Sequence, residues 1–403
     1  MGAAACHDGW VKQLVVVALA IAVLVGIPAS TARAQARTPT TIVVPTGDDF
    51  YVPPVPLPSG KPGALIWAET IAAPLGARAW RVLSHTKSIA RQDAALSGVV
   101  VTPDGPAPKR GRPIVSWAHG TTGLADLCAP SKASDAAFRI PFVNELLAAG
   151  YVVAATDYQG LGTPGVHPYL VGESEGRAVL DTARVARKLA AGAGKRVLIA
   201  GHSQGGHAAL FASEIASRYA PELEVVGTAA GAPVTDVRQF LDLAALSPSS
   251  AGFLVMGAQG YSAAYPELAR APLFTESAAS RASIAVNRCA AEVILTFAGD
   301  APGSLFTSDP NQVAMWREKL YENAPGNRRS AAPILVWQGN TDVLTPSTLV
   351  FPYVQKACAK KSIVEYREYQ GADHGSVMIA AKDDVLSFFA ARLAGDPPQS
   401  SCR

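Results

Sequence analysis

The stretch RVLIAGHSQGGHAALFASEIASRY, residues 196–219, decides the fold of this chain. Its short apolar start, Arg196–Ala200, is typical of a buried strand, and Gln204–Tyr219 is typical of a helix. Between them, GHSQG matches the motif G-x-S-x-G, which places a serine on a sharp turn between a strand and a helix. The turn is too tight for a Cβ atom two residues before or after the serine, so Gly201 and Gly205 fit those places. The alternative is a serine in an ordinary glycine-rich turn, but this context predicts that Ser203 is a nucleophile.

On both sides of this stretch, short apolar runs alternate with helical segments. The runs expected to be strands are 97–102, 113–118, 151–156, 225–230, 333–338 and 363–369. Such alternation predicts the α/β class, with a mostly parallel central sheet and helices on both faces. The pattern weakens over 235–330, which we interpret as a cap or lid subdomain inserted late in the sheet. It carries apolar patches such as Phe253–Met256, and we expect the inner face of the cap to form an acyl pocket above Ser203. The alternative is a packed structural subdomain without an acyl channel.

These observations divide the chain into five parts. We expect a signal peptide, an extended proline-rich arm, a first part of the core, the cap insertion and a second part of the core, at residues 1–34, 35–79, 80–234, 235–330 and 331–403 respectively.

The N-terminus has the order of an export signal. Lys12 precedes a 14-residue apolar run, Leu14–Ile27, and Ala32-Arg33-Ala34 follows as a cleavage site. The run is shorter than the roughly 20 residues that a membrane-spanning helix needs. A retained signal anchor is the alternative. We expect a mature protein that begins near Gln35 and is secreted, either to the medium or to the cell envelope, without a stable membrane span.

The bulk composition excludes other classes of protein. Apolar residues make up 49% of the 403 residues and charged residues 17%, with a formal net charge of +3. This balance is typical of a compact globular enzyme and gives no basis for a nucleic-acid partner.

A serine nucleophile needs a general base that is held by a third group. The order serine, acid, histidine is that of the α/β-hydrolase fold, and His374 follows Ser203 in a loop before the last helix. Asp342 lies in the turn after the strand 333–338 and is the preferred acid. Asp300, inside the insertion, and Asp373, adjacent to the histidine, are the alternatives.

The oxyanion formed during such a reaction needs two amide donors. We expect the backbone amide of Gln204, at the start of a helix, to supply one. The loop HGTTG, residues 119–123, follows a strand and is expected to supply the other from Thr121, with Thr122 as the alternative. The histidines 119, 202 and 207 are interpreted as structural residues.

Four cysteines remain after removal of the leader: Cys128, Cys289, Cys358 and Cys402. An even number in an exported chain predicts two disulfides, and the spacing leaves all three pairings open. No close cluster of cysteine and histidine suggests a metal, and the chemistry requires no cofactor.

Several motifs together resemble the secretory lipase family of α/β-hydrolases, the fungal lipase A type and its actinobacterial relatives. These motifs are HGTTG (119–123), CAPS (128–131), ATDYQGLGTPGVHPYL (155–170), GHSQGGHA (201–208), WQGNTDVLTP (337–346) and GADHGS (371–376). The resemblance runs from about Pro45 to Cys402. It implies a triacylglycerol lipase or carboxylesterase with a cap domain, and the catalytic triad Ser203, Asp342 and His374.

The same resemblance implies the disulfide pairs Cys128–Cys289 and Cys358–Cys402. The sequence departs from the fungal members in having Gln204 after the nucleophile.

The function expected is hydrolysis of lipid esters, presented at a lipid–water interface, through an acyl-enzyme on Ser203. The alternatives on the same fold are a serine peptidase, an acyltransferase and a short-chain esterase without lipase activity. A catalytically dead binding protein is the alternative from another class.

Overall fold

A computed structural model describes residues 44–189, 192–270 and 272–402. The predicted signal peptide therefore lies outside the described residues. In this part of the chain the strands form one nine-stranded sheet in the order β1-β2-β3-β5-β4-β6-β7-β8-β9. The strands are β1 (Leu65–Ile71), β2 (Ala77–Lys87), β3 (Asp93–Pro103), β4 (Arg112–Ala118), β5 (Val152–Thr156), β6 (Ala193–His202), β7 (Glu224–Gly231), β8 (Ile334–Gly339) and β9 (Val364–Tyr369).

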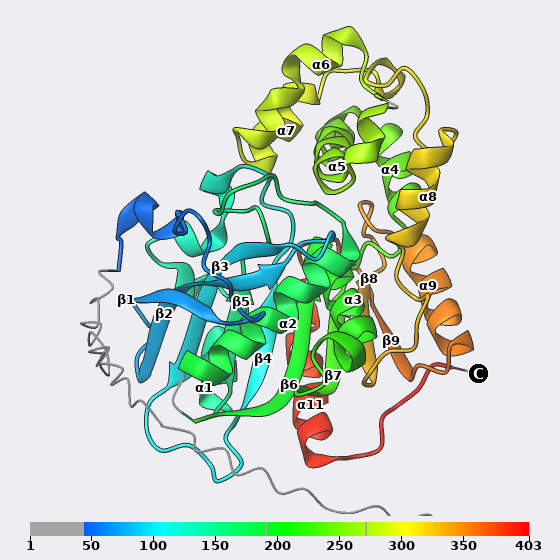
Figure 1. The fold of residues 1–403 in the computed structure, drawn as a ribbon. Coiled ribbons are helices and arrows are strands. Elements are labelled where there is room, and N and C mark those ends of the chain that lie inside the picture. Colours follow the sequence, from blue (N-terminus) through cyan, green and yellow to red (C-terminus); the bar gives the residue numbers. More distant parts are fainter. Residues whose placement is uncertain (1–43, 190–191, 271, 403) are drawn as a thin grey trace, which may run out of the picture. The chain divides into compact units, whose positions relative to one another are not determined.

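Strands β5, β4, β6, β7, β8 and β9 are parallel to one another in that order. The pairs β1–β2, β2–β3 and β3–β5 are antiparallel. Helices cover both faces of the sheet (Figure 1). The helices of this core are α1 (Val143–Ala148), α2 (Gly172–Leu189), α3 (Gln204–Tyr219), α9 (Ser347–Ala359), α10 (Val377–Ala380) and α11 (Lys382–Ala394). The predicted α/β-hydrolase architecture of the sheet and its two helical layers is confirmed.

Strand β6 shows how the sequence pattern assigns side chains to the two faces. Val197 and Ile199 pack with residues of α2 and α3, whereas Leu198 and Ala200 pack with residues of α1 and α11. Successive side chains of a strand point to opposite faces, so a continuous apolar run is needed where both faces are covered. The carboxyl end of β6 is thereby fixed between two helical layers, and Ser203 follows directly after it.

The N-terminal part differs from the expected surface arm over residues 35–79. Strand β1 lies inside this range and joins the sheet. Phe50 and Tyr51 are buried in a small cluster with Trp67, and the indole nitrogen of Trp67 donates to the carbonyl of Phe50 at 2.8 Å. Prolines remove backbone donors only at their own positions, and the aromatic side chains between them still anchor the segment. The prediction of an arm over this whole range is therefore corrected.

Between β7 and β8 the chain forms a separate layer of helices, drawn in yellow-green to yellow in Figure 1. They are α4 (Val237–Ala245), α5 (Ala251–Ala264), α6 (Glu276–Ala282), α7 (Ala290–Phe297) and α8 (Ala314–Glu322). We refer to residues 235–330 as the cap.

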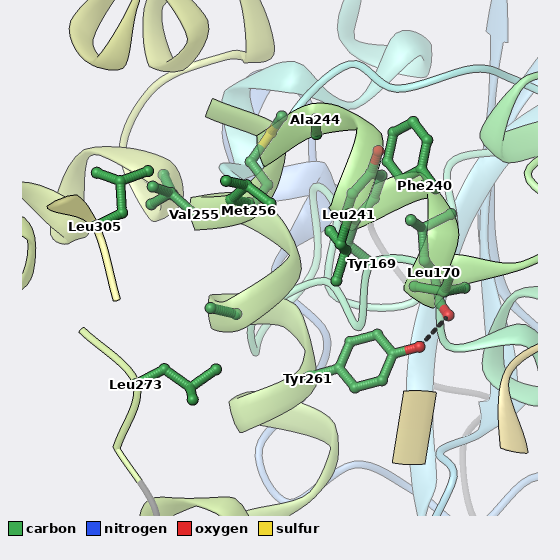
Figure 2. Close-up of a cluster of buried hydrophobic side chains, with 14 of the residues drawn as sticks. Tyr169, Leu170, Phe240, Leu241, Ala244, Val255, Met256, Tyr261, Leu273 and Leu305 are labelled. Carbon is green, nitrogen blue, oxygen red and sulfur yellow. Dashed lines mark hydrogen bonds between the residues drawn. The ribbon is translucent and has the colours of Figure 1, made fainter. Parts of the chain in front are cut away.

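The apolar patch of the cap, Phe253–Met256, is divided between a cavity and the interior. Phe253 lines a cavity of about 190 Å³ together with Val343 and Leu344. Leu254, Val255 and Met256 are buried in the cap's own apolar cluster, which includes Tyr261 (Figure 2). The hydroxyl of Tyr261 donates to the carbonyl of Leu170 at 3.1 Å, so this cluster also reaches the core. An apolar run without a helical or strand period does not show whether its side chains face a ligand or their own subdomain. Here three of the four residues pack internally.

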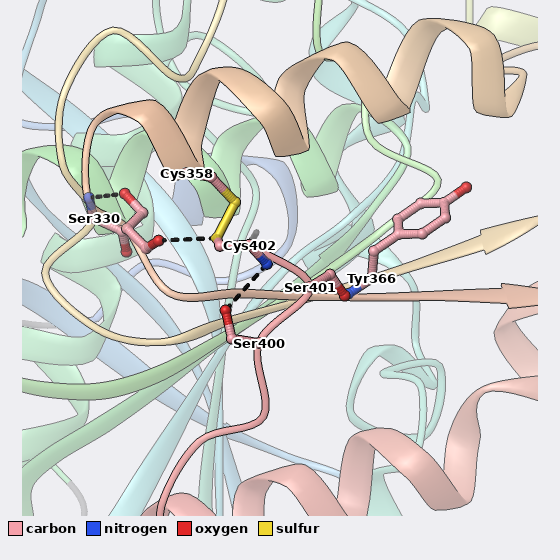
Figure 3. The surroundings of a disulfide bond; sticks show 7 residues. Ser330, Cys358, Tyr366, Ser400, Ser401 and Cys402 are labelled. Atoms are coloured by element: carbon pink, nitrogen blue, oxygen red, sulfur yellow. Dashed lines mark hydrogen bonds between the residues drawn. A yellow bond between two sulfur atoms is a disulfide. The ribbon is translucent and has the colours of Figure 1, made fainter.

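Two disulfides are present, Cys128–Cys289 and Cys358–Cys402, the pairing that the family resemblance implies. The second ties the C-terminal segment to α9 (Figure 3). Beside it, the amide of Ser401 donates to the carbonyl of Val364 at 2.7 Å. The C-terminal segment is thus held along β9. Among the described helices, none combines the length and the apolar character needed to cross a membrane.

Candidate active site

Ser203 occupies a strained turn between β6 and α3. Its backbone has φ 61° and ψ −120°, a conformation that non-glycine residues rarely adopt. A Cβ atom on Gly201 would lie 2.1 Å from the carbonyl oxygen of Gly205, and one on Gly205 would lie 1.9 Å from that of Ala118. Both glycines are therefore required for the turn to close. The geometry is that of the nucleophile turn predicted from the motif.

The carboxylate of Asp342 and the ring of His374 are in direct contact. Oδ2 of Asp342 accepts a hydrogen bond from Nδ1 of His374 at 2.7 Å. The other oxygen of Asp342 accepts from the backbone amides of Leu344 and Thr345 at 2.8 and 2.9 Å. Burial acts to raise the pKa of Asp342, but the hydrogen bonds from His374 and Thr345 outweigh it and the net pKa is lowered. Asp342 is thus an ionised acceptor that orients the histidine.

The two alternative acids have other partners. Asp300 lies in the cap, where its two oxygens accept from the guanidinium of Arg281 at 2.9 and 3.1 Å. Asp373 folds back on its own loop, where Oδ1 accepts from the amides of Gly375 and Ser376 at 3.0 and 2.7 Å. Neither carboxylate is hydrogen-bonded to His374.

The neighbouring His202 links His374 to the turn that bears Ser203. Nε2 of His202 lies 2.7 Å from the carbonyl oxygen of His374, and the two ring centroids are 4.7 Å apart. Burial lowers the pKa of His202 to about 4, aided by the nearby His374, so its ring is neutral and donates to that carbonyl. Within the described residues, the hydroxyl of Ser203 has no direct hydrogen bond to His374. Such bonds are often long before a substrate binds.

The glycine loop after β4 lies against the nucleophile turn. A Cβ atom on Gly120 would lie 3.6 Å from the Cβ of Ser203. The hydroxyl of Thr121 is hydrogen-bonded to that of Tyr169 at 2.8 Å. The carbonyl of Thr122 accepts from the amide of Ala290, the first residue of α7, also at 2.8 Å. No backbone partner is recorded for the amides of Thr121 and Thr122 in the described part of the chain. Both therefore remain available as donors.

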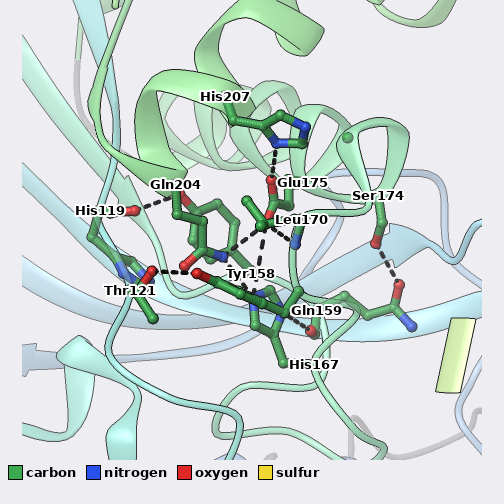
Figure 4. Close-up of polar contacts among 12 residues, drawn as sticks. His119, Thr121, Tyr158, Gln159, His167, Leu170, Ser174, Glu175, Gln204 and His207 are labelled. Carbon is green, nitrogen blue, oxygen red and sulfur yellow. Dashed lines mark hydrogen bonds and ion pairs between the residues drawn. The ribbon is translucent and has the colours of Figure 1, made fainter. Parts of the chain in front are cut away.

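Helix α3 begins at Gln204, so the amide of this residue is among the first four, which have no partner inside the helix. The side chain of Gln204 is buried and enters a polar cluster that sequence reasoning missed (Figure 4). At its centre is the carboxylate of Glu175 on α2, with His167 and His207 beside it. A glutamate on an amphipathic helix gives no signal of burial by itself. Glu175 is distinguished from a solvated glutamate only by its contacts with two buried histidines and a buried glutamine, which come from other parts of the sequence.

A cavity of about 730 Å³ adjoins the glycine loop. Its wall includes Gly120, Thr121 and Thr122, and apolar side chains from several other segments. Those apolar side chains are Val99, Trp117, Leu127, Ile140 and Met378, together with several alanines. The space is of the size that drug-sized ligands occupy, and its lining is mainly apolar.

No group of three or more histidine, cysteine, aspartate or glutamate side chains suited to a metal ion occurs in residues 44–189, 192–270 and 272–402.

Comparison with known proteins identifies the relatives of this chain. The sequence pattern of the secretory lipase family matches residues 129–401. The chain is 25% identical over 391 residues to lipase A of Moesziomyces aphidis, which covers 89% of this chain and 82% of that protein. It is 26% identical over 392 residues to a secreted triacylglycerol lipase of Malassezia globosa, with 88% and 81% covered.

Among solved structures, the X-ray structure of Candida antarctica lipase A superimposes with a TM-score of 0.76 at 20% identity and covers 89% of each chain. This likeness supports the fold, and the sequence match over residues 129–401 supports the family. The chain belongs to the secretory lipase family and is a secreted carboxylic ester hydrolase with the α/β-hydrolase fold.

Proposed function

We propose that this chain hydrolyses carboxylic esters of lipids through an acyl-enzyme on Ser203. The observation that carries the proposal is the 2.7 Å hydrogen bond between Asp342 and Nδ1 of His374, beside the turn that bears Ser203. It leaves Nε2 of His374 as the nitrogen that exchanges protons with the substrate.

In the first step, Oγ of Ser203 attacks the ester carbonyl carbon while Nε2 of His374 takes the hydroxyl proton. The oxyanion is held by the amides of Gln204 and Thr121, with Thr122 as the alternative to Thr121. The proton then passes to the departing alcohol as the ester bond breaks. Water attacks the acyl-enzyme with His374 again as base, and the carboxylic acid leaves.

The alternatives on this fold predict different products, so a set of substrates separates them. Ser203→Ala should abolish ester turnover and labelling by a fluorophosphonate, with circular dichroism unchanged. The wild-type enzyme should release fatty acid from emulsified triolein and from p-nitrophenyl esters. Turnover of dipeptide anilides without any ester would favour a peptidase. Acyl transfer to an added alcohol in preference to water would favour an acyltransferase. A Ser203→Ala variant that retained activity would contradict the proposed mechanism.

A lipid substrate is supported by two exposed apolar side chains close in sequence to the pair, one in the turn after Asp342 and one on α10. Val343, next to Asp342, is 84% exposed, and Ile379, five residues after His374, is 79% exposed. Exposed apolar side chains near a site are suited to contact with a lipid surface. Val343→Ser with Ile379→Ser should therefore reduce turnover of emulsified triolein more than turnover of dissolved p-nitrophenyl acetate. Equal losses on both substrates would contradict this contact.

We further propose that the acyl chain occupies the cavity beside the glycine loop. Ala133 lies on its wall and is only half-buried, so a larger side chain there projects into the space. Ala133→Phe should shorten the preferred chain, and each methylene excluded should cost about 0.8 kcal/mol, roughly fourfold in kcat/KM. Ala291→Phe, which extends another part of the wall, is a second variant for the same test. The comparison is between octanoate and acetate esters. An unchanged chain-length profile in both variants would contradict this assignment.

A further inference from the structure

Glu175 carries a carboxyl group that is buried in the described structure. It is 1% exposed and lies on α2, one layer behind the nucleophile turn. Its Oε1 accepts from the amide of Leu170 at 3.0 Å and from the side-chain nitrogen of Gln204 at 2.7 Å. Its Oε2 faces Nδ1 of His207 at 2.7 Å (Figure 4). Each oxygen therefore has a specific donor, although the catalytic steps above use none of them.

The side-chain nitrogen of Gln204 donates two hydrogen bonds. One points to Glu175 and the other to Nε2 of His167 at 2.8 Å. His167 must then be an acceptor at Nε2, and its Nδ1 donates to the carbonyl of Gln159 at 3.1 Å. Burial lowers the pKa of His167 to about 4, which agrees with a neutral ring. The orientation of the glutamine amide is thus fixed by its partners.

His207 differs from His167 because both of its nitrogens face oxygen. Nδ1 faces Glu175 and Nε2 lies 2.9 Å from the carbonyl oxygen of Asn323, at the end of α8. Nε2 therefore donates to this carbonyl, and Nδ1 shares a proton with the carboxyl group of Glu175. Glu175 and His207 thus form a buried hydrogen-bonded pair. Such pairs are costly to desolvate and contribute little net stability, so their value lies in the geometry they impose.

That geometry reaches both amides proposed for the oxyanion. Gln204, bound by Glu175, contributes the first amide of α3. On the other side, Glu175 holds Leu170, and the preceding residue, Tyr169, is hydrogen-bonded to the hydroxyl of Thr121 at 2.8 Å. Glu175 is thus bonded directly to the side chain of Gln204, and it is connected to Thr121 by two hydrogen bonds, through Leu170 and the adjacent Tyr169.

We propose that Glu175 is a positioning residue that sets the amides of Gln204 and Thr121 at the spacing the oxyanion requires. This inference rests on the proposed function, because it assigns a role in the same reaction. It places the carboxylate outside the reacting atoms, where it acts through hydrogen bonds and not through its charge.

Two substitutions separate hydrogen bonding from charge. In Glu175→Gln the amide oxygen accepts from Leu170 and Gln204, and its NH₂ donates to a neutral His207. All contacts survive, so this variant should retain kcat within a few-fold. Gln204→Met removes the link but leaves the backbone amide in place. Its kcat should fall by about 10- to 100-fold, below the 10²- to 10³-fold typical of losing a whole oxyanion donor, while KM stays unchanged.

A control on the same helix tests for a general effect of altering a buried carboxylate. Asp181 is fully buried on α2 and accepts from Thr86, Tyr219 and Arg184 at 2.6, 2.8 and 2.7 Å, none of which touches the nucleophile turn. Asp181→Asn should change thermal stability but keep kcat.

The decisive measurement is the inhibition constant of a trifluoromethyl ketone. The hydroxyl of Ser203 adds to the ketone carbonyl, and the resulting oxyanion lies between the two proposed amide donors. Across the variants its Ki should rise in proportion to the fall in kcat/KM, because both report oxyanion binding. A folded Gln204→Met enzyme with wild-type kcat and Ki, while Ser203→Ala is inactive, would refute this inference alone. An active Ser203→Ala enzyme would instead refute the proposed function. A Glu175→Gln enzyme as impaired as Gln204→Met would show that the charge, and not the hydrogen bonding, is needed.

Discussion

Two carboxylate–histidine pairs lie on either side of the nucleophile turn, and their inner contacts are the same. Asp342 and His374 are 2.7 Å apart at Nδ1, and so are Glu175 and His207. The difference is at the other ring nitrogen. In His207 it is bound to the carbonyl of Asn323 in a fully buried site, whereas the His374 side chain is 18% exposed with no hydrogen bond recorded at Nε2 in the described residues. A histidine held by a carboxylate can act as a base only where its second nitrogen is open to substrate.

The largest effect expected from this comparison follows removal of each histidine in turn. His374→Ala should lower kcat by on the order of 10⁴- to 10⁶-fold and leave thermal stability nearly unchanged. His207→Ala should do the reverse: it leaves the buried Oε2 of Glu175 without its partner, which should cost about 3–5 kcal/mol of unfolding free energy. Its kcat should fall by no more than about 100-fold, the limit set by the oxyanion donors. Steady-state kinetics and urea unfolding of both variants check this contrast. A catalytic loss in His207→Ala as deep as that in His374→Ala would make the two pairs equivalent and contradict it.

The two carboxylates should also respond differently to amide substitution. In Asp342→Asn the side-chain oxygen keeps the two backbone amides, so the NH₂ group faces Nδ1 of His374. Nδ1 must then accept and Nε2 carries the proton, so the ring no longer presents Nε2 as a base. We expect a loss of about 10⁴-fold in kcat. The same change at Glu175 should have little effect, because the NH₂ group of a glutamine can donate to Nδ1 of His207 while Nε2 still donates to the carbonyl of Asn323. Measurement of kcat for both variants, with fluorophosphonate labelling to count active sites, tests the difference. Similar losses in both would show that the charge matters in both pairs.

The smallest expected effect concerns Glu214, a buried carboxylate outside the two histidine pairs, whose contribution to the free energy of unfolding depends on pH. Burial raises the pKa of Glu214 on α3 to about 7, although the amide of Gly326 donates to it. A raised carboxyl pKa means that the folded state binds the proton more tightly, so this stabilisation is present below pH 4.5 and is lost as pH rises through 7.

Glu214→Gln mimics the protonated form and should gain stability over the wild type between pH 5 and pH 8, by up to about 3 kcal/mol. Urea unfolding at both pH values measures the gain. Glu318→Gln, at an exposed position, is the control and should show no such trend. A constant difference between wild type and Glu214→Gln at the two pH values would contradict the shift.

The pairs also show what the sequence predicts and what it does not. The turn at Ser203 was predictable because two glycines and a strand–helix boundary are local features. Asp342 and His374 were reached from their order in the chain and from loops after strands. Glu175 was not reached, because its partners come from positions 29 and 32 residues away that only packing brings together.

Other differences have the same origin. The pairing of β1 with β2 was missed because prolines between residues 53 and 58 dominate the local signal there. The apolar patch at 253–256 was assigned to a pocket because apolar character alone does not distinguish a ligand surface from an internal core. The sequence predicts features that depend on neighbours along the chain, and it fails where burial is decided by distant contacts.

The disulfide Cys128–Cys289 connects the cap covalently to the segment that follows the glycine loop. Next to it, Gly123 pairs with Cys289 and the amide of Ala290 donates to Thr122. At the start of α7 the cap therefore cannot separate from the core, because the disulfide attaches it covalently next to the loop that bears Thr121 and Thr122. Helix α7 and the loop that bears Thr121 and Thr122 are therefore tethered to each other at this end, and we expect them to move together.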